Sequence, residues 1–141
     1  MKISARNQFR GVVTAVQGGA VNGVVVIDVA GQTVKSDITM ESIKELGLET
    51  GVAAIAVIKA SNVLIAAASE PIANISARNQ FVGTIDKITI GAVNGHVSLA
   101  LANDSKITAS ITNAAIEELG LREGQNAVAI VKSTDVMVAI D

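Results

Sequence analysis

A heptapeptide rich in hydrogen-bond donors, ISARNQF, occurs twice in this chain, at Ile3–Phe9 and again at Ile75–Phe81. If the segment is a strand, Ser4, Arg6 and Gln8 share one face, because strand side chains repeat every two residues. A face that carries a hydroxyl and a guanidinium suits an oxyanion, because both groups donate hydrogen bonds and one is charged. We therefore expect each copy of the heptapeptide to contribute to an anion site.

The polar residues that both halves retain are nearly all donors or cations. Thr39 is expected to cap a helix whose first turn favours negative charge, and Ser42 adds a second hydroxyl at that end. Lys59 is an isolated cation that follows a long apolar run and needs solvent or an anion. The retained pairs are Ser4/Ser76, Arg6/Arg78, Asn7/Asn79, Gln8/Gln80, Asn22/Asn94, Thr39/Thr112, Glu45/Glu118 and Lys59/Lys132.

Each of these residues also has a simpler interpretation. Arg6 alone suits a solvated strand, Thr39 alone suits a helix cap, and Lys59 alone suits the edge of a sheet. No single structural need explains all of them together in two diverged copies. Their joint retention favours a binding function.

Residues typical of catalysis are missing or unmatched. The sole histidine, His96, stands where the first half has Val24, and we expect it to be a solvated strand residue. The chain has no metal-ligand spacing of His and carboxylates, no GxSxG and no phosphate-binding glycine loop. Asp28, Asp37 and Asp86 are not matched between the halves. We expect no acid–base or nucleophilic enzyme.

Composition narrows the class further. The 141 residues are 50% hydrophobic and 17% charged, with a net charge of −2, two Phe and no Cys. The core must be aliphatic, and neither a disulfide nor a thiolate site can form. No basic stripe marks a nucleic-acid partner. No apolar run has the length of a signal peptide or a membrane span, so we expect a cytoplasmic protein without a membrane partner.

The sequence is a tandem duplication. Beyond the heptapeptide, GAVNG recurs at Gly19–Gly23 and Gly91–Gly95, and ITMESIKELGL at Ile38–Leu48 matches ITNAAIEELGL at Ile111–Leu121. We expect two domains, at 1–68 and 75–141, which pack against each other. The linker at about 69–74 holds the only proline, Pro71, which stiffens it.

Each unit has mostly β periodicity with one short helix. Apolar, β-branched segments separated by Gly and Asn predict strands. Thr39 as N-cap and Gly47 as C-terminal cap delimit the helix, and Thr112 and Gly120 repeat this pattern. The predicted fold is all-β with one short helix per unit, as two tandem OB-like five-stranded β-barrels. In the first unit the expected strands cover 5–17, 24–30, 33–38, 52–58 and 62–67.

SARNQ, the GAVNG turn and the ITxxSxxxLGL segment followed by a lysine resemble the Mop domain, a molybdate-binding module. The arrangement of two modules resembles the di-Mop, ModG-type cytoplasmic molbindins. The resemblance implies an OB-like barrel, rings of six modules and therefore a homotrimer of this chain. It also implies that molybdate or tungstate is the ligand, held between modules. The implied ligand residues are Ser4, Arg6, Thr39, Ser42 and Lys59, then Ser76, Arg78, Thr112, Lys132 and Ser133.

The two halves depart from this pattern at different places. Ala60 follows the lysine of the first unit, where the second has Ser133, and Ala115 of the second unit replaces Ser42. We therefore expect the two units to bind unequally, or backbone N–H groups to replace the missing hydroxyls. Weaker candidates for backbone donors lie in the GAVNG segments, at Ala20, Val21, Ala92 and Val93.

The sequence leaves two other functions to compare with oxyanion binding. OB barrels often bind single-stranded nucleic acid, but they stack bases on aromatic side chains in a basic groove. Two Phe and an acidic balance argue against this alternative. A purely structural assembly module would leave the paired Ser, Arg, Thr and Lys unexplained. The sequence thus favours an oxyanion-binding protein of molybdenum storage or homeostasis.

Overall fold

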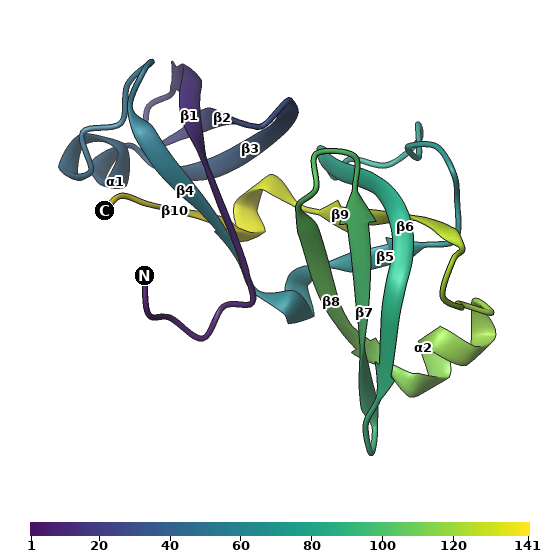
Figure 1. Cartoon of the computed structure of the whole chain (residues 1–141). Coiled ribbons are helices and arrows are strands. Elements are labelled where there is room, and N and C mark those ends of the chain that lie inside the picture. The colour runs from purple at the N-terminus through teal and green to yellow at the C-terminus, as the bar shows by residue number, and fades with distance from the viewer.

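The computed structural model describes all 141 residues as two curled five-stranded sheets, each with one short α-helix (Figure 1). The elements of the first repeat are β1 (Asn7–Gly18), β2 (Asn22–Val29), β3 (Gln32–Thr39), α1 (Met40–Glu45), β4 (Ala53–Ile58), the 3-10 turn η1 (Ala60–Asn62) and β5 (Leu64–Ala66). Those of the second are β6 (Asn79–Ile90), β7 (Asn94–Leu101), β8 (Lys106–Thr112), α2 (Asn113–Glu118), β9 (Asn126–Val131), η2 (Ser133–Asp135) and β10 (Val136–Ala139).

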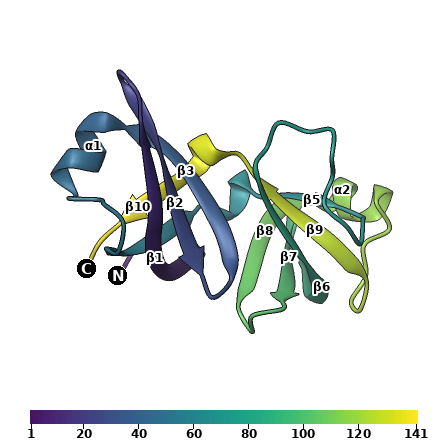
Figure 2. The same ribbon diagram turned by 90° about the horizontal axis from the view of Figure 1, so that it is seen from above.

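The fifth strands are exchanged between the two sheets. The strand orders are β10-β4-β1-β2-β3 and β5-β9-β6-β7-β8, with every recorded pair antiparallel. The expectation that segment 62–67 ends the sheet of its own unit is therefore wrong, because β5 pairs with β9. In Figure 2 the yellow β10 crosses to the first sheet, while the teal β5 lies beside β9.

The repeated sequence explains why this exchange is possible. The two fifth strands come from copies of one unit, so each finds an equivalent partner strand in either sheet. Their partners, β4 and β9, have five consecutive buried residues each, as their continuous apolar runs predicted. The unit boundaries 1–68 and 75–141 stay a prediction for the repeats, and neither sheet coincides with one of these segments.

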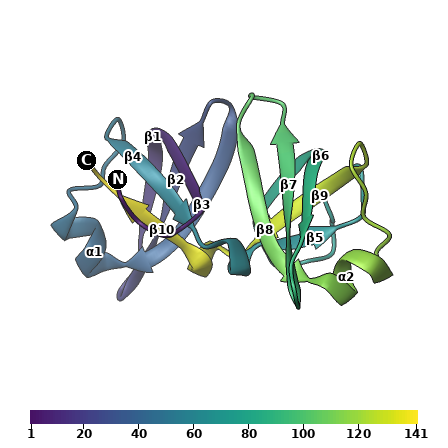
Figure 3. The same ribbon diagram turned by 60° about the horizontal axis from the view of Figure 1, so that its bottom comes forward.

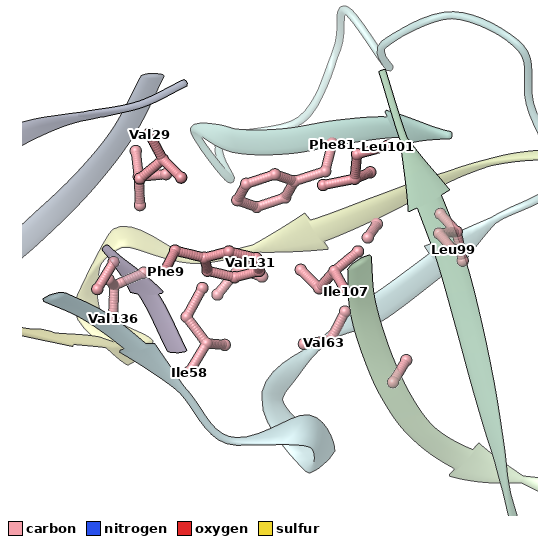
Figure 4. Packing of buried hydrophobic residues seen from close by; sticks show 14 of the residues in the cluster. Phe9, Val29, Ile58, Val63, Phe81, Leu99, Leu101, Ile107, Val131 and Val136 are labelled. Carbon is pink, nitrogen blue, oxygen red and sulfur yellow. The ribbon is translucent and has the colours of Figure 1, made fainter. Parts of the chain in front are cut away.

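Both sheets share one hydrophobic core. A single cluster of 25 buried residues takes members from both repeats. At its centre the rings of Phe9 and Phe81 stack across the junction, with centroids 6.0 Å apart and planes inclined by 18° (Figure 4). The last residue of each ISARNQF copy therefore joins the two halves.

The asparagine of each heptapeptide also joins the halves. Asn7 is buried; its Nδ2 donates to the Thr108 carbonyl and its Oδ1 accepts from the Thr108 N–H, both at 2.8 Å. Asn79 does the same with Lys35, at 2.8 Å to the carbonyl and 2.7 Å from the N–H. We call these the asparagine clamps. Each clamp satisfies the edge of the third strand in the opposite repeat, where the ladder would otherwise end.

The predicted helix caps are present. The Oγ1 of Thr39 accepts from the Ser42 N–H at 3.1 Å, and the Oγ1 of Thr112 accepts from the Ala115 N–H at 3.1 Å. Gly47 and Gly120 end the helices with φ of +62° and +60°, which favours glycine. Neither helix has the length and apolar character that crossing a membrane would require.

Candidate functional site

The start of each ISARNQF copy lies at the same end of the sheet as the lysine that both repeats retain, Lys59 or Lys132. Asn7 pairs with Ile58, so Arg6 and Lys59 flank this last pair of the β1–β4 ladder. Asn79 pairs with Val131 in the same way, which places Arg78 beside Lys132. We call these groups the arginine–lysine corners. The first comprises Ser4, Arg6 and Lys59, and the second comprises Ser76, Arg78, Lys132 and Ser133.

The strand geometry expected for the heptapeptide is only partly correct. β1 begins at Asn7, and Ser4 and Arg6 lie in bends before it. The alternation that placed Ser4, Arg6 and Gln8 on one strand face therefore does not apply. The Gln8 side chain instead donates to the Ala5 carbonyl at 3.3 Å, which folds the segment back on itself.

Each corner lies beside the opposite repeat. η1, which follows Lys59, contacts β8, and η2, which follows Lys132, contacts β3. Figure 3 shows both short turns between β3 and β8, at the junction of the two barrels. The strand exchange thus carries the lysine of each repeat to the third strand of the other.

The predicted hydroxyl donors form a separate group at the helix starts. Thr39 donates from Oγ1 to the Ser42 Oγ at 2.9 Å. The β1–β2 hairpin lies next to them, because the Met40 N–H donates to the Val21 carbonyl at 2.7 Å. The second repeat repeats this contact, from the Asn113 N–H to the Val93 carbonyl at 2.8 Å. We call these groups the helix corners: Thr39, Ser42, Ala20 and Val21 in the first repeat, and Thr112, Ala92 and Val93 in the second.

The two kinds of corner lie at opposite ends of the same repeat. β1 is 12 residues long and runs from the arginine–lysine corner at Asn7 to the hairpin that contacts α1. At a rise of about 3.3 Å per residue, the path along this strand is about 36 Å. The predicted residues of one repeat therefore cannot all reach one small anion.

The cations of the arginine–lysine corners are exposed and form no ion pair within the chain. The chain has two ion pairs, Arg10–Asp141 and Lys106–Asp86, and neither involves Arg6, Lys59, Arg78 or Lys132. These four cations are exposed, as are Ser4, Ser76, Thr39 and Thr112, whereas Ser42 and Ser133 are half-buried. Only Arg78 among the ten predicted residues lines a cavity of the single chain.

Two features of the junction were not recognised from sequence. The retained Asn7 and Asn79 were noted as donors, but their role as clamps depends on the exchange, which periodicity does not reveal. Lys35 was not singled out because it has no cationic counterpart at the equivalent Thr108. His96 is half-buried on β7, opposite Thr89 and Ser110, as a strand residue should be.

Two repeats of one barrel, each beginning with the donor-rich ISARNQF segment, define the class of protein. A family model described as the TOBE domain matches residues 3–65 and again 75–138. The chain belongs to the TOBE-domain family and contains two such domains. The Mop-type resemblance and the expected mostly-β, two-barrel fold are thereby confirmed.

Two similar proteins have names that refer to molybdenum. The chain is 43% identical over 141 residues to the molybdenum transport protein ModE of Herbaspirillum seropedicae. It is 40% identical over 141 residues to the molybdenum-pterin-binding protein MopA of Rhodobacter capsulatus. Each alignment covers 99% of this chain, and the chain spans about half the length of these curated relatives, at 52% and 53%.

A solved structure matches the whole chain. It is the cytoplasmic molybdate-binding protein ModG in a crystal form with molybdate bound. The TM-score is 0.95 at 42% sequence identity, and the match covers 100% of both chains. The fold of this chain is therefore the fold of a relative whose structure contains bound molybdate.

Proposed function

We propose that this chain is a binding protein for molybdate, or tungstate, that serves intracellular molybdenum storage or homeostasis in the cytoplasm, and that it is not an enzyme. The observation that carries the proposal is the full-length match to a molybdate-bound relative. The four cations of the arginine–lysine corners support it independently, because none of them forms an ion pair within the chain.

The chemistry of these corners suits a tetrahedral dianion. Molybdate is deprotonated at neutral pH, so it accepts hydrogen bonds and donates none. Hydroxyl, guanidinium and ammonium groups only need to donate, and charge-assisted hydrogen bonds are the strong type. Two cations per corner match the charge of the ligand. We assign the anion contacts to Ser4, Arg6 and Lys59, and to Ser76, Arg78, Lys132 and Ser133 in the second repeat.

Assembly completes the site in this proposal. The helix corners, with Thr39, Ser42 and Thr112, lie too far along their own strands to reach the arginine–lysine corner of the same repeat. A neighbouring copy can supply them, and the exposed hairpin tips at Val21 and Val93, 74% and 72% exposed, offer apolar surface for that contact. We propose a homotrimer, in which backbone donors near Ala20, Val21, Ala92 and Val93 also approach the anions.

The nucleic-acid alternative lacks the stacking surface that it would need. Base stacking requires accessible aromatic rings. Phe9 and Phe81 are 5% and 1% exposed and stack on each other in the core. The chain therefore offers no Phe, Tyr or Trp ring to a base.

Titration calorimetry with molybdate tests the assignment. We expect Arg6→Ala and Lys59→Ala each to weaken binding by about tenfold or more, because each removes a charge-assisted hydrogen bond. We also expect the oligomer to stay intact in light scattering. Lys44→Ala, which removes an exposed cation of α1, is the matched control and should bind normally.

Two results would count against the proposal. Unchanged affinity in Arg6→Ala or Lys59→Ala would remove that residue from the site. A stoichiometry below one anion per chain would contradict sites in both repeats.

A further inference from the structure

A cavity of about 400 Å³ lies at the junction of the two repeats, within a single chain. Its walls come from β3, from the linker and from the start of β6. Apart from Pro71, none of its lining residues is hydrophobic, and they are Gln32, Thr33, Lys35, Pro71, Arg78 and Gln80. We call it the junction cavity.

Two cations without an ion-pair partner line this cavity. Lys35 and Arg78 come from different repeats, and neither is in either of the two ion pairs of the chain. The acidic residues near the cavity are Asp28, which pairs with Thr33 across β2 and β3, Asp37, which lies two residues from Lys35 on β3, and Glu70, which precedes Pro71. None of these three carboxylates lines the cavity or forms an ion pair with its cations. Both Lys35 and Arg78 are therefore free to pair with an anionic ligand.

The walls are held in place by hydrogen bonds. The Asn79 clamp fixes the backbone of Lys35. The Gln80 side chain fixes the linker, because its Oε1 accepts from the Ile72 N–H at 2.6 Å and its Nε2 donates to the Ile72 carbonyl at 2.9 Å. Gln80 is thus engaged with protein, and the groups free to bind a ligand are the Lys35 ammonium, the Arg78 guanidinium and the Thr33 hydroxyl.

The equivalent junction on the other side lacks these features. Arg6 and Gln8 correspond to Arg78 and Gln80, but Thr108 stands in place of Lys35. The one lysine nearby, Lys106, pairs with Asp86 at 2.8 Å, and this hydrogen bond lowers the pKa of the Asp86 carboxyl. None of the cavities of the chain is lined by Arg6, Gln8 or Thr108. The junction cavity is therefore specific to one side of the molecule.

The lining indicates the ligand class. Pockets for drug-like molecules are mostly lined by hydrophobic and aromatic side chains, whereas Pro71 is the one apolar residue that lines this cavity, although its volume is within the range that holds small molecules. We propose that the junction cavity binds a compact polyanion of the pyrophosphate class, with one anionic group on Lys35 and another on Arg78. This ligand and this cavity lie beyond the proposed molybdate function, with which they share only Arg78.

Calorimetry with magnesium-free pyrophosphate, in the absence of molybdate, tests this proposal on the whole chain. Lys35→Thr places the residue of the other junction at this position and should weaken pyrophosphate binding about tenfold. Lys44→Thr, on the exposed face of α1, should leave it unchanged. Asp28→Asn should strengthen binding by a few fold, because it removes a negative charge opposite Thr33.

The outcomes separate the two proposals. If pyrophosphate fails to bind at millimolar concentration, or binds Lys35→Thr as tightly as the unaltered chain, the junction cavity is not an anion site. If pyrophosphate binds in a Lys35-dependent way while molybdate does not bind at all, the cavity assignment holds and only the proposed molybdate function fails. Lys35→Thr should keep the circular dichroism spectrum and the urea midpoint of the unaltered chain, which verifies that the variant is folded.

Discussion

Thr39 and Thr112 occupy the same place in the two repeats, yet their hydroxyl groups have different surroundings. Both accept from a backbone N–H of the helix, but only Thr39 also donates to a second hydroxyl, that of Ser42. The second repeat has Ala115 there and carries its extra hydroxyl at Ser133, beside the lysine. Each repeat therefore has one additional hydroxyl. It lies at the helix corner in the first repeat and at the arginine–lysine corner in the second.

The contacts that build the fold are much more alike. Both asparagine clamps have the same atoms and nearly the same distances, and both fifth strands cross to the other sheet. One difference remains in the barrels. The buried Ser36 hydroxyl donates to the Val136 carbonyl of β10, whereas Ala109 stands at the equivalent position of β8. The two repeats thus share a common frame, which consists of the asparagine clamps and the exchanged strands, and they differ in the position of their additional hydroxyl donors.

Breaking the frame should give the largest effect. Asn7→Ala and Asn79→Ala each remove two hydrogen bonds and leave a buried strand edge unpaired, which should cost about 2–4 kcal/mol of the free energy of unfolding. Urea unfolding measures this cost. Asn74→Ala in the exposed linker is the control and should be neutral. Costs that differ by more than about 1 kcal/mol between the two clamps would contradict their equivalence.

A smaller effect is expected where the barrels differ. Ser36→Ala should lower the free energy of unfolding by about 1–2 kcal/mol, because the Val136 carbonyl loses a buried donor. Ser61→Ala, at an exposed residue of η1, should have no effect in the same urea titration. An unchanged Ser36→Ala protein would mean that this bond does not help to hold β10.

The smallest effect should come from the extra hydroxyl of the first repeat. Ser42→Ala frees the Thr39 hydroxyl to donate directly, as Thr112 can, so molybdate affinity should fall by about threefold at most. Calorimetry against Ala115→Ser, which adds the hydroxyl to the second repeat, measures the difference. A tenfold loss in Ser42→Ala would show that the two hydroxyls of the first repeat are not interchangeable.

The duplication, the strands, the helix caps and the buried β4 and β9 could be predicted from the sequence, because each has a local signal. The exchange could not, since Leu64–Ala66 and Val136–Ala139 come from copies of one unit and either sheet accepts either strand. The donors were recognised from their retention in two copies. Their distribution over opposite ends of a barrel depends on strand length and pairing, so the sequence did not separate the arginine–lysine corners from the helix corners.

A crystal grown with molybdate, read at the molybdenum absorption edge, tests the central claim most directly. Our account predicts anomalous peaks for molybdate ions whose oxygens lie within hydrogen-bond distance of Arg6 and Lys59 and of Arg78 and Lys132, with a second copy of the chain closing each site. A monomeric protein without bound molybdenum, or peaks coordinated by a single copy alone, would contradict the claim that neighbouring chains share these sites.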